Sequence, residues 1–256
     1  MDGREPKRTI RLEEIMAGHS KWANIKHRKE RSDAKKGKIY TRIAKEIISA
    51  VKVGGADPKG NPRLRLAISK AREENVPNDV IDRNIKKASS ADQADYVDCT
   101  YELYGHGGVG IVVEAMTDNK NRLASDMRIA TNKRGGTIAT PGSVTFNFER
   151  KGVLHVSKEK ANEDDLFMAA TESGADDFSA EEQVYIITTD PSSLYTVKDA
   201  LNTKGFQTSQ AELEMWPKTE VECDPENMQS NLALIEWLED LDDVDAVYHN
   251  MKAPES

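Results

Sequence analysis

The sequence has 256 residues, of which 38% are hydrophobic and 31% are charged, and its formal net charge is −8. This composition is typical of a globular protein with a sizeable core, and the 2 cysteines exclude a disulfide scaffold. No apolar run reaches the length of about eighteen residues that a membrane span needs, and residues 1–15 lack the apolar core of a secretory signal. We therefore expect a cytoplasmic protein with no membrane partner.

The charges are distributed unequally along the chain. Residues 1–90 contain 23 Lys and Arg against 12 Asp and Glu, whereas residues 91–256 contain 13 against 32. Such asymmetry indicates a nucleic-acid-binding module joined to an acidic body. The alternative is a solvated basic domain that has no polyanionic partner.

The first ninety residues predict a small helical domain. Apolar residues recur at helical spacing from Ile39 to Val51, and Gly54-Gly55 ends this helix. Asn61-Pro62 begins a second helix, and Val76-Pro77-Asn78-Asp79 begins a third. We interpret residues 1–16, which have no periodic pattern, as a disordered extension or a misassigned start.

Strands and helices alternate in the rest of the chain without long βαβ runs, which predicts α+β sandwiches and not a doubly wound sheet. The predicted strands are residues 100–104, 109–115, 144–148, 153–156, 184–188, 210–216 and 244–248. The predicted helices are residues 121–134, 163–173, 192–203 and 230–241. Arg150-Lys151-Gly152 predicts a tight turn between two of the strands.

The stretch from His19 to Lys45 is the main candidate for a nucleic-acid-binding site. Lys and Arg side chains neutralise phosphates, and aromatic rings stack on unpaired bases. The candidate residues are His19, Lys21, Trp22, Lys26, His27, Arg28, Lys29, Lys35, Lys36, Lys38, Arg42 and Lys45. Since the apolar face of the first helix turns inward, we expect Lys38, Arg42 and Lys45 on its solvent side. Trp22 is either a stacking residue or a core anchor of the domain.

This basic stretch contains no helix-turn-helix pattern or zinc-finger spacing, so we expect recognition of the backbone or the shape of the nucleic acid. A secondary basic patch lies farther along the chain and comprises Lys120, Arg122, Arg128, Lys133 and Arg134. It either extends the nucleic-acid surface or pairs with acidic neighbours.

Residues 105–110, Gly-His-Gly-Gly-Val-Gly, match the G-x-G-x-x-G pattern of dinucleotide-binding proteins. A second strand follows them, so no helix N-terminus is available for a pyrophosphate, and we interpret them as a turn between antiparallel strands. The acidic runs have no calcium-loop spacing and predict a solvated or partner-facing surface. No catalytic set assembles, so we expect neither an enzyme nor a cofactor, metal ion or small-molecule substrate.

Several separated segments resemble the YebC/PmpR family, which includes the mitochondrial translational activator of cytochrome oxidase. They are residues 16–29 (MAGHSKWANIKHRK), 101–110 (YELYGHGGVG), 117–122 (TDNKNR), 133–136 (KRGG) and 231–238 (NLALIEWL). The resemblance implies a basic helical domain (17–95), a central α+β domain (96–152 plus 219–252) and an α+β domain inserted into it (153–218).

The family resemblance also implies a function in gene expression. Members of this family are usually described as cytoplasmic transcriptional regulators that bind DNA. The mitochondrial relative and some bacterial members are instead linked to translation and act at the ribosome to relieve stalling on proline-rich stretches. Our first hypothesis is a DNA-binding regulator, whose acidic domains engage the transcription machinery. The alternative is a ribosome-associated factor that binds ribosomal RNA. A third is an acidic interaction scaffold with no affinity for nucleic acid.

Overall fold

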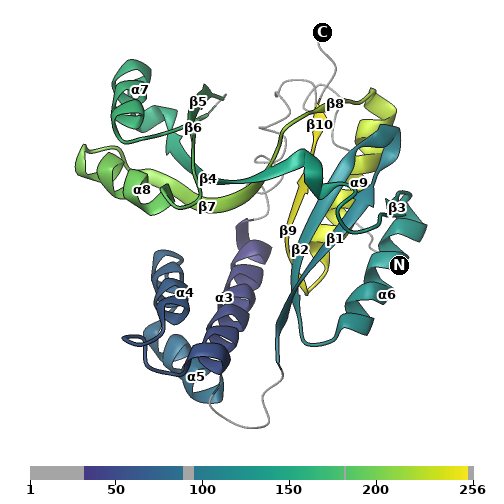
Figure 1. Ribbon diagram of the computed structural model, residues 1–256, viewed down its shortest axis with the longest axis horizontal. Helices are drawn as coiled ribbons and strands as arrows, with labels where there is room; N and C mark the ends of the chain where they lie inside the picture. The colour runs from purple at the N-terminus through teal and green to yellow at the C-terminus, as the bar shows by residue number, and fades with distance from the viewer. Residues whose placement is uncertain (1–31, 89–94, 182, 253–256) are drawn as a thin grey trace, which may run out of the picture.

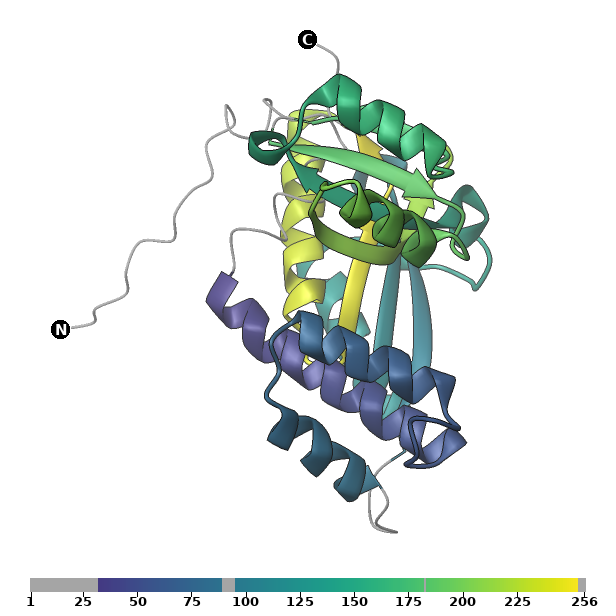
Figure 2. The ribbon, with the colours of Figure 1, turned by 90° about the vertical axis from the view of Figure 1, so that its left-hand side faces the viewer.

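The computed structural model describes residues 32–88, 95–181 and 183–252. In this part of the chain, three N-terminal helices precede two four-stranded sheets, each covered by helices (Figure 1). The predicted α+β class, with an N-terminal helical bundle followed by sheet-containing parts, is therefore confirmed. Figure 2 places the helical bundle at one end of the molecule and the helices of the second sheet at the other.

The helical bundle is formed by α3 (Ser32–Gly54), α4 (Pro62–Glu73) and α5 (Asn78–Ala88), which share one core around Ile47 and Leu64. Asn61 joins the first two helices. Its side-chain oxygen accepts the Leu64 N–H at 3.0 Å and caps α4, while its side-chain nitrogen donates to the Ala50 carbonyl at 2.8 Å. The helix start predicted at Asn61-Pro62 is confirmed.

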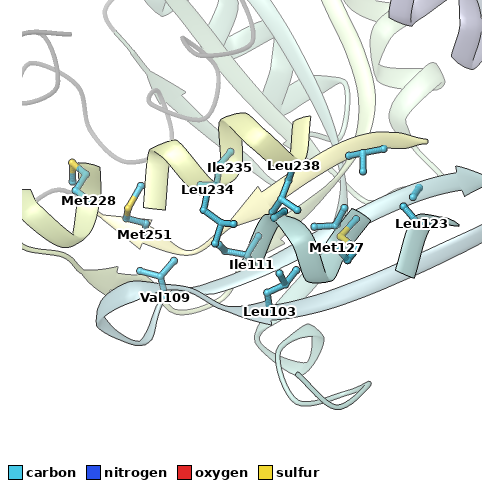
Figure 3. Packing of buried hydrophobic residues seen from close by; sticks show 14 of the residues in the cluster. Leu103, Val109, Ile111, Leu123, Met127, Met228, Leu234, Ile235, Leu238 and Met251 are labelled. Carbon is cyan, nitrogen blue, oxygen red and sulfur yellow. The ribbon is translucent and has the colours of Figure 1, made fainter. Parts of the chain in front are cut away.

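The central sheet has the strand order β3-β1-β2-β9, and α6 (Lys120–Arg134) and α9 (Pro225–Asp240) cover one of its faces. Its strands are β1 (Val97–Tyr104), β2 (Gly110–Thr117), β3 (Thr137–Ile138) and β9 (Val244–His249). Figure 3 shows Leu103 and Ile111 of the sheet facing Met127, Leu234 and Leu238 of the two helices. The apolar side of α9 therefore covers a sheet whose first strand begins more than a hundred residues earlier in the sequence.

The second sheet has the order β5-β6-β4-β7, and α7 (Glu163–Glu172) and α8 (Leu194–Thr203) cover one face. Its strands are β4 (Phe148–Ser157), β5 (Asp177–Ala180), β6 (Val184–Thr189) and β7 (Thr208–Pro217). All of these strands lie in the sequence between β3 and β9 of the central sheet. A short parallel pair, β8 (Val221–Glu222) and β10 (Met251–Lys252), completes the described strands.

The tight turn predicted at Arg150-Lys151-Gly152 is wrong, because β4 runs without interruption through these residues and pairs with β7 along its length. The segment Thr145–Asn147, predicted as strand, is a short 3-10 helix. Gly152 lies where β4 closely approaches the start of helix α8, since a Cβ at this position would lie 2.9 Å from the Cβ of Leu194. The predicted boundary between residues 152 and 153 consequently falls inside a strand, and the domain boundaries remain predictions.

Candidate nucleic-acid interface

Most residues of the predicted basic stretch fall outside the described part of the chain. These are His19, Lys21, Trp22, Lys26, His27, Arg28 and Lys29, together with the side chains of Lys35 and Lys36. Lys38, Arg42 and Lys45 of α3 are the predicted binding residues whose side chains the structure places.

The expectation that these three side chains lie on the solvent side of α3 is wrong for Lys45, which is 7% exposed. Its ammonium group donates to the Met116 carbonyl at 3.0 Å and to the Asp243 carboxylate at 3.1 Å. The half-buried Lys38 donates to the carbonyls of Glu239 and Leu241, and burial lowers the pKa of its ammonium group. Both lysines therefore attach α3 to the end of the central sheet.

The physical reason is that α3 is packed on two sides. Residues 47–51 are all buried, which exceeds the single apolar stripe of a surface helix. The helices α4 and α5 cover one side, and the turn between α9 and β9 meets the other. The spacing of apolar residues indicated only the first of these two contacts.

Asp243 is the centre of a buried ionic cluster that joins three segments. Besides Lys45, it binds the guanidinium of Arg122 at 2.7 Å and the hydroxyl of Thr117 at 2.8 Å. Burial opposes the charged form of Asp243, but these hydrogen bonds outweigh it and hold the pKa of the carboxyl below its ordinary value. For Arg122, this favours the predicted alternative of pairing with acidic neighbours, since Asp118 also binds it at 2.7 Å.

A second charged group lies along the same junction. Arg42 pairs with Glu46 at 3.2 Å, and Lys70 of α4 reaches the same carboxylate at 3.4 Å. Burial raises the pKa of the nearby Asp245 to about 6, although Arg42 and Lys45 act against it. Arg42 is half-buried here, so its exposure is lower than predicted.

Besides Lys52 of α3 and Lys59 in the following connection, most exposed basic side chains of the helical bundle lie on α4 and α5. They are Arg63, Arg65, Arg72, Arg83, Lys86 and Lys87. Arg63 and Arg83 take part in exposed ion pairs with Asp98 and Asp79, and such pairs contribute little to stability. This basic surface was not predicted from the sequence. The basic residues in the last turns of both helices are the feature of the sequence that could have indicated it.

The secondary basic patch lies on α6, where Lys120, Arg122, Arg128, Lys133 and Arg134 are all exposed. Arg134 lies over the ring of Trp237, 5.2 Å from its centroid. Among these residues, Arg122 also binds the buried Asp243 and so supports the fold. A test of this patch for nucleic-acid binding therefore has to leave Arg122 in place.

Residues 105–110 form a turn between the antiparallel strands β1 and β2, as predicted. Gly107 adopts a φ of 68°, a left-handed conformation that favours glycine. Asn231 of α9 holds this turn, because its side chain accepts the His106 N–H at 2.7 Å and donates to the His106 carbonyl at 3.0 Å.

Gly105→Ala is expected to lower the free energy of unfolding by about 1–3 kcal/mol, because the new Cβ would overlap the Asn231 side-chain oxygen. Urea unfolding followed by circular dichroism measures the change. Gly60→Ala is the matched control, since only one backbone oxygen, at 3.9 Å, lies near its Cβ. Equal stability of the two variants would contradict the role of Asn231 in fixing the turn.

The acidic run Glu163-Asp164-Asp165 occupies the first turn of α7. Negative side chains at this position interact favourably with the positive end of the helix dipole. Within residues 32–88, 95–181 and 183–252, no group of three or more His, Cys, Asp or Glu side chains is arranged to hold a metal ion. None of the helices in these ranges is long and apolar enough to cross a membrane.

The comparisons with known proteins agree with the resemblance of the sequence motifs. Residues 20–91 match the TACO1/YebC protein N-terminal domain, and residues 96–251 match the TACO1/YebC second and third domain. A probable transcriptional regulatory protein of Protochlamydia amoebophila is 73% identical over 240 residues, which cover 94% of this chain and 98% of the relative. Another of that name, from Chlamydia pneumoniae, is 59% identical over 237 residues, covering 92% and 100%.

A solved structure agrees as well. The crystal structure of a conserved hypothetical protein from Aquifex aeolicus has a TM-score of 0.82 and 40% sequence identity to this chain. The match covers 93% of this chain and 98% of that one. Similarity at this level extends over both sheets and the helical bundle, so the chain is a member of the TACO1/YebC family.

Proposed function

We propose that this protein is a cytoplasmic, nucleic-acid-binding regulator of gene expression, with DNA as its first candidate target. The observation that carries the proposal is the charge partition, with 23 basic against 12 acidic residues in the first 90 positions. A polyanion is the partner that such a domain attracts most strongly. The names of the relatives support a role in transcription.

The placement of the basic residues favours binding to the phosphate backbone. The middle of α3 lies between the other helices and the central sheet, so it cannot enter a major groove as a reading helix. The exposed Arg and Lys side chains of α4 and α5 lie outside this buried junction, although Arg63 pairs with Asp98 of β1. The predicted residues before Lys38 add positive charge to the same domain of the sequence. Backbone contacts position a protein on nucleic acid without reading its sequence.

The test is a fourfold variant in which Lys26, Arg28, Lys35 and Lys36 become Ala. If about six basic groups contact duplex DNA, the slope of log K against log salt is roughly −5, and this variant reduces its magnitude by about 3 to 4. Fluorescence anisotropy at several salt concentrations measures both the affinity and the slope.

A charge-matched control removes Lys158, Lys160, Lys198 and Lys204 from the second sheet and its helices. This control is expected to leave the slope within about one of the wild-type value. Equal losses in the two variants would refute a site in the basic helical domain. Unchanged binding in the first variant would move the site to the exposed basic residues of α4 and α5 or to Arg128, Lys133 and Arg134 of α6.

The second candidate function is binding to ribosomal RNA as part of a ribosome-associated factor. The burial of α3 favours it, because recognition without a reading helix suits folded RNA, which proteins recognise largely by shape. Sedimentation of tagged protein through a ribosome gradient, with nuclease-treated and high-salt controls, separates the two. Co-migration that is lost at high salt supports the ribosome, whereas protein at the top of the gradient together with recovered promoter DNA supports transcription.

A further inference from the structure

A short loop on the second face of the central sheet is held in one conformation by a buried carboxylate. The loop comprises residues 139–147 and joins β3 to β4. Glu102 of β1 is 6% exposed and accepts the N–H groups of Gly142 and Val144 at 2.6 Å and of Thr145 at 2.8 Å. Hydrogen bonds to an ionised carboxylate are strong, so Glu102 restrains the backbone of this loop at three residues.

The same loop is attached at further points along its length. The Tyr104 hydroxyl donates to the Ser143 carbonyl at 2.7 Å, and the Asn147 side chain donates to the Thr219 carbonyl at 2.8 Å. The Lys218 ammonium donates to the Phe146 carbonyl at 2.9 Å. The loop is therefore anchored to β1 on one side and to the segment after β7 on the other.

Despite these restraints, the loop holds an aromatic ring in solvent. Val144 and Phe148 on either side pack into the core, whereas Phe146 is 70% exposed. Tyr104, whose hydroxyl contacts the loop, is itself 42% exposed. An ordered loop that presents an exposed ring is a feature of binding surfaces, because the ring adds nothing to the core.

One exposed basic side chain lies beside this loop. Lys218 is exposed, and its hydrogen bond places its charge next to Phe146. Beyond Tyr104, Gly136 brings the end of α6 against the first strand, since a Cβ there would lie 3.0 Å from the Tyr104 carbonyl. The end of α6 lies on the other face of the sheet, where the Arg134 guanidinium lies over the ring of Trp237 and the His106 ring contacts the Arg134 carbonyl at 2.9 Å.

We infer that Tyr104 and Phe146 form a stacking platform for unpaired bases of a single-stranded nucleic acid, with Lys218 beside its phosphates. Proteins commonly bind single-stranded nucleic acid with exposed aromatic rings that lie next to cationic side chains. Tyr104 and Phe146 are both exposed aromatic residues. On α7, by contrast, Phe167 is exposed beside the aliphatic Met168. The inference rests on the proposed function and adds to it a second contact surface and a class of ligand.

The test measures binding of the full-length protein to fluorescein-labelled oligouridylate and to duplex DNA by anisotropy. Phe146→Leu keeps an apolar side chain but removes the ring, and is expected to weaken oligouridylate binding by about fivefold to a hundredfold. Phe146→Trp is expected to bind at least as tightly as the wild type. Phe167→Leu on α7 is the matched control, with no expected change, and duplex binding is expected to be the same in all variants.

The outcomes separate this inference from the proposed function. Oligouridylate binding that is unchanged in Phe146→Leu and in Tyr104→Leu, but lost in the fourfold basic variant, overturns the platform and leaves the proposed function standing. Loss of oligouridylate binding in both Phe146→Leu and Phe146→Trp also overturns it, because a stacking site accepts any aromatic ring. A wild-type protein that binds neither probe overturns both. Because Phe146 lies outside the core, the thermal midpoints of its variants are expected to match the wild type.

Discussion

Asp243→Ala is expected to lower the free energy of unfolding by about 3–5 kcal/mol, the usual result of removing one partner of a buried ion pair. Its carboxylate is 6% exposed and accepts hydrogen bonds from Lys45, Arg122 and Thr117. Without it, the Lys45 ammonium stays buried with two backbone carbonyls and the ring of Tyr96 as partners and no carboxylate bound to it. Urea unfolding followed by circular dichroism at neutral pH measures the loss.

Two further variants make this result specific. Asp242→Ala removes a neighbouring, exposed carboxylate but keeps the backbone carbonyl that Lys45 uses, so a change within about 0.5 kcal/mol is expected. Lys45→Met leaves Asp243 paired with Arg122, so it is expected to cost less than Asp243→Ala. Equal stability of the Asp242 and Asp243 variants would show that the cluster contributes nothing to the attachment of α3.

Glu102→Gln is expected to lower the free energy of unfolding by about 2–3 kcal/mol at neutral pH. The glutamine amide has one acceptor oxygen where the carboxylate has two, and its NH2 group faces backbone donors of the loop 139–147. The same substitution loosens the platform, so weaker oligouridylate binding is also expected. Urea unfolding and the anisotropy assay measure the two effects on one protein.

The pH dependence of this difference gives an independent check. Burial acts to raise the pKa of Glu102, but hydrogen bonds from Gly142, Thr145 and Val144 outweigh it and hold the pKa below its ordinary value of 4.5. The folded state then binds this proton less tightly than the unfolded chain. Its stabilisation is full above about pH 4.5 and is lost as the pH falls through the lowered pKa. The stability gap between wild type and Glu102→Gln is therefore expected to shrink in acid.

Asp245 titrates in the opposite sense and has to be separated from this effect. Its pKa is raised to about 6, so the folded protein binds its proton more tightly than the unfolded chain and the ionised form costs stability. That cost is full above about pH 6 and declines as the pH falls from there to the ordinary value of 3.8. Because Asp245 is the same in wild type and Glu102→Gln, its contribution cancels in their difference. A gap that stays constant as the pH falls from 7 through the lowered pKa of Glu102 would contradict the assigned role of this residue.

The elements of this fold follow closely from local patterns in the sequence. The apolar spacing after Ile39 predicts α3, and Asn61-Pro62 predicts the start of α4, because capping and periodicity act over one or two helical turns. The strand β2 is a continuous apolar run, Ile111-Val112-Val113, which signals that both faces of the central sheet are covered. The loop that binds Glu102 was not predicted from the sequence, because its contacts with β1 are made about forty residues apart.

The sequence by itself determined the class of the protein, the basic helical part, most of the helices and strands and the family motifs, but it did not predict the short strands β3 and β5. Only the tertiary structure decided that Lys45 is buried, that residues 150–152 continue a strand, and that Phe146 stands in solvent on a fixed loop. The physical reason is the range of the interactions. Helix periodicity and caps depend on neighbours in the chain, whereas Lys45 and Asp243 are 198 residues apart and meet only because the helical bundle packs on the central sheet.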